Sequence, residues 1–171
     1  LLSPGAKPTR PNMSGIDNGK IFTLRTVEDT LKIHRFVREQ RPKSAAVIGG
    51  GFIGVEMAEN LSQLGMKVTV IEYSDHLMAP LDFDMACAVH AQMRKRGIEL
   101  KLSTAVTGFE TKGGSVVIHT ASGAEMVADM VLLAVGVTPD TDLAKRAGLA
   151  LGIRNSIVVN DRMETSVPDI Y

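Results

Sequence analysis

The segment Val-Ile-Gly-Gly-Gly-Phe-Ile-Gly-Val-Glu at positions 47–56 has glycines at positions where the backbone itself can do chemistry. Gly49, Gly51 and Gly54 have the spacing G-x-G-x-x-G. The first glycine permits a tight turn, the second lets backbone approach a pyrophosphate, and the third lets a helix pack closely on a strand. A helix that begins here offers N–H groups and partial positive charge to phosphates. The pattern predicts a dinucleotide-binding turn, whereas a plain hinge needs no such order.

An acidic residue at the end of the next predicted strand is the second chemical signal. A carboxylate about 20 residues beyond the glycines accepts hydrogen bonds from an adenosine ribose, and Glu72 has this position. A 2′-phosphate about 4 Å from it would cost about 1 kcal/mol in water and about 4 kcal/mol at a surface-like dielectric, or about one to three decades of affinity. Residues 73–80 contain no Arg or Lys to offset the charge. We expect NAD(H) to be preferred over NADP(H).

Two other interpretations of the glycines stay open at this point. Fingerprints of this kind bind FAD as readily as NAD, so the glycines alone do not choose between these cofactors. A glycine turn also occurs in parallel folds without a ligand, and Glu72 would then be a solvated residue at a strand end. The surrounding elements and motifs must decide.

The glycines lie inside a predicted strand–helix–strand unit. Residues 45–48 are a continuous apolar run, typical of a parallel strand buried on both faces. Residues 67–71 form the next strand. Between them, apolar residues recur at helical spacing: Ile53, Met57, Leu61 and Leu64.

Further elements are expected on both sides of this unit. Thr26 and Asp29 match a capping box for a helix over residues 27–39. We predict a helix over 82–96, strands over 98–102 and 130–135, three brief antiparallel strands near 106–110, 115–120 and 125–127, a short helix over 141–147 and a strand over 157–159. The fold class is α/β: a Rossmann-like parallel sheet with flanking helices and an inserted three-stranded antiparallel β-meander, in which strand 130–135 lies beside strand 45–48.

Composition excludes several classes of partner. The 171 residues contain 19 basic and 19 acidic side chains, so the net charge gives no sign of nucleic-acid or anionic-membrane binding. The longest apolar run, residues 130–135, is too short to span a bilayer. A single cysteine excludes an intrachain disulfide and fits a reducing compartment. We expect a cytoplasmic protein whose partner is a small-molecule dinucleotide, with no nucleic acid and no membrane.

Other reactive side chains give no second site. Cys87 and His90 are three residues apart on a predicted helix, and a thiolate–imidazole pair is conceivable, but nothing supplies an orienting acid or an oxyanion site. We interpret Cys87 as a small half-buried residue. His34, His76 and His119 are dispersed, with no two at metal-ligand spacing. We therefore predict no catalytic residue and no metal site within this chain.

Several segments resemble the pyridine nucleotide-disulfide oxidoreductases, flavoproteins with two dinucleotide sites. Leu-Ser-Pro-Gly-Ala at 2–6 resembles the exit from the FAD domain in the NADH oxidase, NADH peroxidase and coenzyme A-disulfide reductase branch. The glycines with Glu56 resemble the NAD(P) fingerprint, Leu-Ala-Val-Gly-Val-Thr-Pro at 133–139 resembles a later glycine motif, and residues 165–171 resemble the run into the second FAD motif. The resemblance implies a remnant of the FAD-domain exit and linker at 1–19, an NAD(P)-binding domain at 20–140, and a truncated segment returning to the FAD domain at 141–171.

The resemblance implies an enzyme in which NADH reduces FAD, and electrons then pass to a disulfide such as coenzyme A disulfide, or to oxygen or peroxide. FAD would be bound mainly outside this chain, and the full-length protein would be a homodimer. This chain alone would bind NADH and catalyse nothing. A stand-alone NAD(H)-sensing module, a lipoamide- or glutathione-type reductase and a ferredoxin-type reductase are the alternatives.

The resemblance also assigns roles to residues. Gly49, Gly51 and Gly54 would hold the pyrophosphate and Glu72 the adenosine ribose, with Tyr73 over the adenine. Phe52, where relatives often have Tyr, and Glu56 would lie near the nicotinamide, although Phe52 could equally pack on the sheet and Glu56 could simply favour the helix dipole. The candidate cofactor-binding residues are Gly49, Gly51, Phe52, Ile53, Gly54, Glu56, Glu72, Tyr73, Val106 on the adenosine side, and Ala134, Val135, Gly136 and Val137 on the nicotinamide-ribose side.

Overall fold

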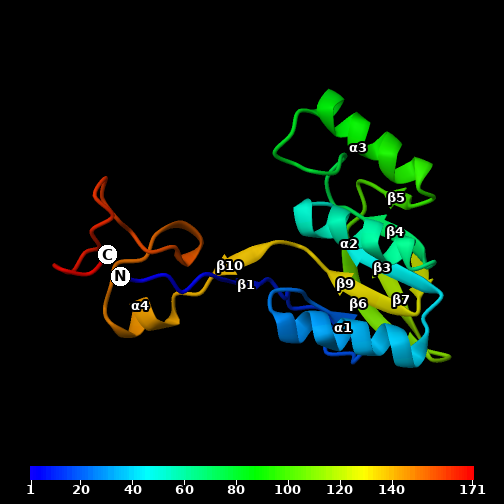
Figure 1. Cartoon of the computed structure of the whole chain (residues 1–171), viewed down its shortest axis with the longest axis horizontal. Helices are drawn as coiled ribbons and strands as arrows, with labels where there is room; N and C mark the ends of the chain where they lie inside the picture. Colours follow the sequence, from blue (N-terminus) through cyan, green and yellow to red (C-terminus); the bar gives the residue numbers. More distant parts are fainter. The chain divides into compact units, whose positions relative to one another are not determined.

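The chain divides into two compact units in the computed structural model, which describes residues 1–171 (Figure 1). The sheet unit is Arg10–Gly136. The terminal unit combines Leu1–Thr9 with Val137–Tyr171. None of the helices has both the length and the apolar character that crossing a bilayer requires.

A five-stranded parallel sheet forms the centre of the sheet unit, with the strand order β2-β9-β3-β4-β5. Its strands are β2 (Ile21–Phe22), β3 (Ser44–Ile48), β4 (Lys67–Ile71), β5 (Glu99–Lys101) and β9 (Met130–Leu133). Ala46 lies opposite Val131, so β9 pairs beside β3 as predicted. The carboxyl ends of parallel strands share one edge of a sheet, and the loops that follow β3, β4 and β9 therefore meet there.

Three helices cover one face of this sheet: α1 (Val27–Gln40), α2 (Phe52–Gln63) and α3 (Phe83–Lys95). Val47 and Leu132 point toward this side and are fully buried with Leu61 of α2 and Met93 of α3. Ile33 of α1 joins the same apolar cluster. Burial on both faces explains why β9 is apolar at every position and β3 is apolar from Ala45 onward.

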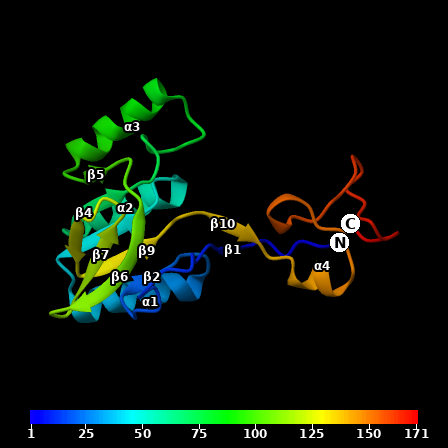
Figure 2. The same cartoon turned by 180° about the vertical axis from the view of Figure 1, so that it is seen from behind.

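An antiparallel sheet covers the opposite face, as Figures 1 and 2 show from the two sides. Its strands are β6 (Val106–Lys112), β7 (Ser115–Thr120) and β8 (Glu125–Ala128), in the order β6-β7-β8. Ile48 and Val131, the alternate residues of the parallel strands, pack here against Phe109, Val116 and Ile118. The predicted fold class, a Rossmann-like sheet with an inserted three-stranded meander, is confirmed.

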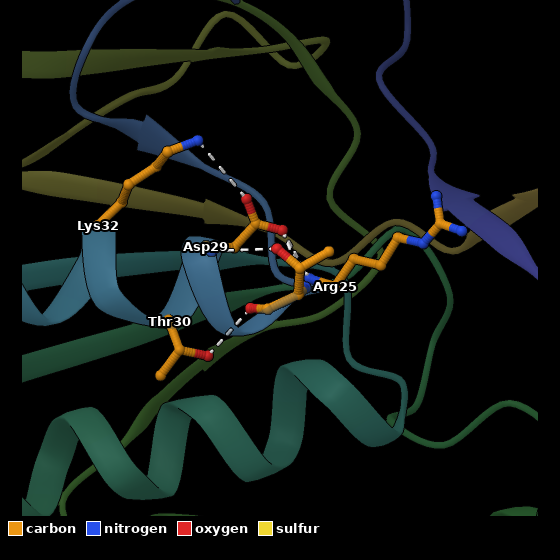
Figure 3. A network of polar contacts seen from close by, with 5 residues as sticks. Arg25, Asp29, Thr30 and Lys32 are labelled. Carbon is orange, nitrogen blue, oxygen red and sulfur yellow. Dashed lines mark hydrogen bonds and ion pairs between the residues drawn. The ribbon is translucent and has the colours of Figure 1, made fainter.

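Helix α1 begins with the predicted capping box (Figure 3). The Thr26 hydroxyl accepts a hydrogen bond from Asp29 N–H at 3.3 Å, and Asp29 Oδ2 accepts from Thr26 N–H at 3.0 Å. Asp29 Oδ2 also accepts from Arg25 N–H at 3.1 Å, and Lys32 Nζ lies 3.9 Å from Asp29 Oδ1. The hydrogen bond from Thr26 N–H lowers the pKa of Asp29. Side chains therefore satisfy one N–H group in the first turn of this helix and those of the two residues that precede it.

The terminal unit brings the two ends of the chain together. Its elements are β1 (Ala6–Pro8), β10 (Val137–Pro139), α4 (Asp142–Arg146) and the 3₁₀ turn η1 (Ile153–Asn155). Strands β1 and β10 pair antiparallel, and Lys7 Nζ lies 2.9 Å from carboxylate oxygens of both Asp140 and Asp142. Apolar side chains remain exposed on this unit, among them Ile153 and Met163.

Several sequence-based expectations are corrected. Strands β1, β2 and β10 were not anticipated, because two or three residues show no periodicity. The expected strand over 157–159 is wrong, since only a single bridge joins Ile157 to Leu151. The buried side of α2 is Gly54, Ala58 and Leu61, whereas Ile53 and Leu64 of the predicted stripe are exposed.

Candidate functional site

A tight turn joins β3 to α2. Gly49 has a φ of +103°, and a Cβ added there would collide with the carbonyl group of Ala134. A Cβ on Gly54 would collide with the carbonyl oxygen of Gly49. Both positions therefore require glycine, because backbone approaches backbone with no room for a methyl group. The result is a helix whose first turn packs directly on the loop that precedes it.

Gly51 differs from the other two glycines of the motif, Gly49 and Gly54. It is the N-cap of α2, with extended backbone (φ −76°, ψ −171°) that any residue can adopt. A Cβ there would meet nothing within 4 Å. No side chain caps α2, and its first turn contains no acidic residue. The N-terminus of α2 thus has the positive end of the helix dipole with neither a side-chain cap nor an acid, an arrangement that can bind an anion such as a diphosphate.

Glu72 follows β4 directly and is fixed beside the glycine turn. Its Oε2 accepts a hydrogen bond from Gly50 N–H at 2.6 Å, and its Oε1 accepts from Ser74 N–H at 2.7 Å. Thr104 N–H donates to the Glu72 carbonyl oxygen at 2.9 Å, which ties the loop after β5 to the same place. Each carboxylate oxygen can accept a further hydrogen bond. Glu72 can therefore hold the turn and also accept a ribose hydroxyl.

Four of the predicted site residues border the turn with exposed side chains. Phe52 and Ile53, in the first turn of α2, are 66% and 43% exposed. Phe52 therefore does not pack on the sheet. Glu56, one turn further along α2, is exposed, and so is Tyr73, which follows Glu72. These side chains are available to contact a ligand.

The loop after β9 also reaches the turn. Ala134 N–H donates to the Ile48 carbonyl oxygen at 2.7 Å, and the carbonyl group of Ala134 lies against Gly49. Val135 and Gly136 continue this loop with exposed positions. Val106 begins β6 and packs, half-buried, against the apolar cluster between the two sheets. Val137 belongs to the terminal unit.

Three residues near the turn were missed by sequence reasoning: Gly50, Leu77 and His90. A Cβ on Gly50 would collide with the side chain of Leu77, and Met78 N–H donates to the Gly50 carbonyl oxygen at 2.8 Å. Gly50 itself, the middle one of three consecutive glycines, was the one local signal of this close approach. Leu77 and His90 gave none, because only the tertiary fold brings them together.

His90 and Cys87 do not form the pair that their spacing allows. His90 is 4% exposed, and its Nε2 accepts a hydrogen bond from Leu77 N–H at 3.0 Å. Burial lowers the pKa of His90, and the nearby Arg94 and His76 lower it further. Cys87 is exposed, which corrects the expectation of a half-buried residue. The His90 imidazole thus accepts a hydrogen bond from the backbone of the loop after β4.

Comparisons with known proteins agree with this geometry. A family model described as pyridine nucleotide-disulphide oxidoreductase matches residues 1–171. The NADH oxidase of Methanocaldococcus jannaschii is 37% identical over 172 residues, which cover 100% of this chain and 38% of that protein. The coenzyme A disulfide reductase of Staphylococcus haemolyticus is 32% identical over 171 residues, which cover 100% of this chain and 37% of that protein. This chain thus spans less than two fifths of the length of either relative.

A solved structure shows the same fold. The reduced CoADR-RHD protein of Bacillus anthracis superposes with a TM-score of 0.92 at 46% identity, covering 98% of this chain and 30% of that one. The likeness extends over both the parallel sheet and the antiparallel meander, because nearly all of this chain is matched. With the family model matching from the first residue to the last, the chain belongs to the pyridine nucleotide-disulphide oxidoreductase family.

Proposed function

We propose that this chain is the NADH-binding part of an FAD-dependent oxidoreductase. The observation that carries the proposal is that Gly51 leaves the N-terminus of α2 without a side-chain cap. A Cβ built on Gly51 would meet no atom within 4 Å. Open N–H groups at a helix end beside a fixed carboxylate suit a diphosphate and its attached ribose. The residues therefore fit a dinucleotide.

Each residue would have a separate task in this site. Gly51 and the first turn of α2 would bind the diphosphate through backbone N–H groups. Glu72 would accept hydrogen bonds from the adenosine ribose, and the exposed Tyr73 would cover the adenine. Phe52 and Glu56 would border the nicotinamide. Bound NADH supplies a hydride, and these residues would orient the nicotinamide toward a flavin held mainly outside this chain.

The preference for NADH over NADPH rests on Glu72. Its two carboxylate oxygens already accept N–H groups from Gly50 and Ser74, so the carboxylate is held in place by the backbone. A 2′-phosphate about 4 Å away would be repelled with a cost of about 1 to 4 kcal/mol. Residues 73–80, which follow Glu72, include no Arg or Lys that would offset this repulsion.

The wider enzyme is part of the same proposal. The relatives named NADH oxidase and coenzyme A disulfide reductase favour transfer of electrons to a disulfide, oxygen or peroxide. The terminal unit keeps Ile153, Met163 and other apolar side chains exposed, which suits packing against the rest of an FAD domain. We propose a cytoplasmic homodimer in which this chain, taken alone, binds cofactor without turnover.

Calorimetric titration of the chain with NADH and with NADPH tests the proposal. NADH should bind about tenfold or more tightly than NADPH. Glu72→Gln should narrow this gap, because it removes the charge and keeps an oxygen that can accept the Gly50 N–H group. Glu110→Gln is the matched control, since Glu110 is an exposed carboxylate on β6.

The outcomes separate the parts of the proposal. Absence of NADH binding would contradict the nucleotide site itself. Equal affinity for NADH and NADPH would contradict the role of Glu72 and leave the diphosphate site intact. A yellow protein that carries flavin after purification would assign the turn to FAD instead.

A further inference from the structure

The loop between β4 and α3, residues 72–82, is held against the glycine turn. The side chain of Leu77 is fully buried and fills the space beside the Cα of Gly50. Met78 N–H donates to the Gly50 carbonyl oxygen at 2.8 Å, while Gly50 N–H donates to Glu72 at 2.6 Å. Both backbone polar groups of Gly50 are thus bonded to this loop. Movement of the loop would release the residue that precedes Gly51.

His90 holds the same loop from the side of α3. Its Nε2 accepts a hydrogen bond from Leu77 N–H at 3.0 Å, and the imidazole is 4% exposed. An imidazole nitrogen can accept only when it carries no proton, so this contact requires neutral His90 with its proton on Nδ1. A protonated ring would direct an N–H group at the Leu77 N–H group and leave both without an acceptor.

Charged groups around His90 favour its neutral form. Arg94 lies one turn further along α3, and His76 comes from the loop, with its Nδ1 2.5 Å from Asp75 Oδ1. The ring of Phe83 lies edge-on to both imidazoles, with ring centroids 5.9 Å from His76 and 6.4 Å from His90. The hydrogen bond to Asp75 raises the pKa of His76, and a protonated His76 would repel a proton on His90. A second proton on this cluster is therefore unfavourable.

We propose that His90 is a positioning residue for nucleotide binding: its neutral imidazole holds Leu77, and thereby keeps the 72–82 loop against Gly50 and the diphosphate-binding turn in shape. This inference rests on the proposed function of that turn. His90 touches no ligand in this scheme and acts through Leu77. Protonation of His90 opens the loop and weakens binding of the nucleotide.

The direction of the pH effect follows from the lowered pKa of His90 in the folded loop. When the loop is open, His90 is in water and takes up a proton near its ordinary value of 6.5. Because the open state binds the proton more tightly, the held state is fully favoured above about pH 6.5. It loses stability as the pH falls below that value toward the lower pKa of the folded form.

The test uses ADP-ribose, which contains the diphosphate and adenosine ribose and cannot transfer a hydride. Its affinity is measured by calorimetry between about pH 8 and about pH 5.5 on the protein at its natural length. His90→Leu removes the acceptor for Leu77 N–H, and His90→Gln replaces it with an amide oxygen that does not titrate. His34→Gln is the matched control, because His34 is exposed on α1. Hydrogen exchange of the 72–82 loop is measured on the same samples.

At about pH 8, His90→Leu should bind ADP-ribose about tenfold more weakly than the unchanged protein. His90→Gln should bind nearly as tightly as the unchanged protein and keep its affinity at lower pH. The unchanged protein and His34→Gln should lose affinity together as the pH falls below about 6.5. Amide exchange of the loop should quicken in His90→Leu alone at the higher pH.

Contrary outcomes are distinct. If ADP-ribose binds with the same affinity and pH dependence in all variants, the positioning role is wrong and the proposed nucleotide site stands. If loop exchange quickens in His90→Leu with no change in affinity, His90 stabilises the loop without positioning the site. If the unchanged protein binds no ADP-ribose, the proposed function fails. If, in addition, amide exchange of the 72–82 loop is the same in His90→Leu as in the unchanged protein, His90 does not hold the loop either.

Discussion

The first turns of α1 and α2 differ in whether a side chain caps their N–H groups. Each helix begins at the carboxyl edge of the parallel sheet, and each has N–H groups with no partner inside the helix. At α1, the Thr26 hydroxyl accepts one of these groups, Asp29 N–H, and the Asp29 carboxylate completes the capping box. At α2, Gly51 provides no side chain, and the first turn contains no acid.

The difference bears on which helix end could bind an anion. A self-capped helix gains stability and has little affinity left for an anion, whereas an uncapped one keeps its N–H groups and dipole available. Helix α3 is intermediate: Asp82 is its N-cap without a side-chain cap bond, and Asp84 places a negative charge in its first turn. Among these three helices, only α2 begins with neither a cap nor an acid.

The largest expected effect comes from giving α2 a side-chain N-cap, as α1 has. Gly51→Asp should be tolerated, because the backbone of Gly51 is extended with negative φ, like that of Thr26. The new carboxylate should stabilise α2 by about 0.5 kcal/mol. It should weaken NADH binding about a hundredfold, since it repels the diphosphate at close range. Thermal unfolding and calorimetric titration measure the two effects.

Gly51→Asn is the control for charge. Asparagine caps a helix about as well as aspartate and has nearly the same shape. Its effect on NADH binding should therefore be smaller than that of Gly51→Asp, with a similar gain in stability. Undiminished NADH affinity in the aspartate variant would show that the diphosphate does not approach the N-terminus of α2.

A second change separates packing from binding within the same turn. Gly54→Ala places a methyl group against the carbonyl oxygen of Gly49, and the contact is backbone, which cannot rotate away. We expect a loss of about 2 kcal/mol in the free energy of unfolding. Chemical denaturation measures this loss.

Gly51→Ala is the matched control for Gly54→Ala. The added methyl group meets nothing within 4 Å, so the loss in the free energy of unfolding should be smaller than for Gly54→Ala, about 1 kcal/mol or less from the poorer N-cap preference of alanine. If both alanine variants were equally stable, the close packing of α2 on the turn would be refuted. Equal stability of the two variants would also remove the reason for assigning helix packing to Gly54 and ligand binding to Gly51.

Local signals explain what could be predicted from the sequence. The capping box of α1 lies within four residues, Thr26 to Asp29, and the glycine motif with its strand and helix lies within about one supersecondary unit. The buried character of strands β3 and β9 followed from a continuous apolar run in each segment. In each case the physical cause is contained in neighbouring residues.

Long-range contacts explain what could not be predicted. The buried face of α2 uses Gly54 and Ala58, small residues that allow close packing and contribute little apolar signal. Leu77 meets Gly50 and His90 only after β4 and α3 have packed on the sheet. Strands β1 and β10 exist only through their mutual pairing across the whole chain. Periodicity cannot report contacts of this kind.

The smallest expected effect tests whether the two helix starts are independent. Thr26→Ala removes the hydroxyl that accepts from Asp29 N–H, and it leaves the bond from Thr26 N–H to Asp29 in place. We expect a loss of about 1 kcal/mol in the free energy of unfolding. NADH affinity should be unchanged, because the first turn of α1 forms no part of the glycine turn.

Thr30→Ala is the matched control, since the Thr30 hydroxyl donates to the Thr26 carbonyl oxygen and caps no N–H group. Alanine has the higher helix propensity, so this variant should be as stable as the unchanged chain or slightly more so. A fall in NADH affinity in Thr26→Ala alone would mean that the two helix ends are coupled through the sheet. Equal NADH affinity in both variants, with a stability loss only in Thr26→Ala, would assign α1's cap to folding and α2's open end to the ligand.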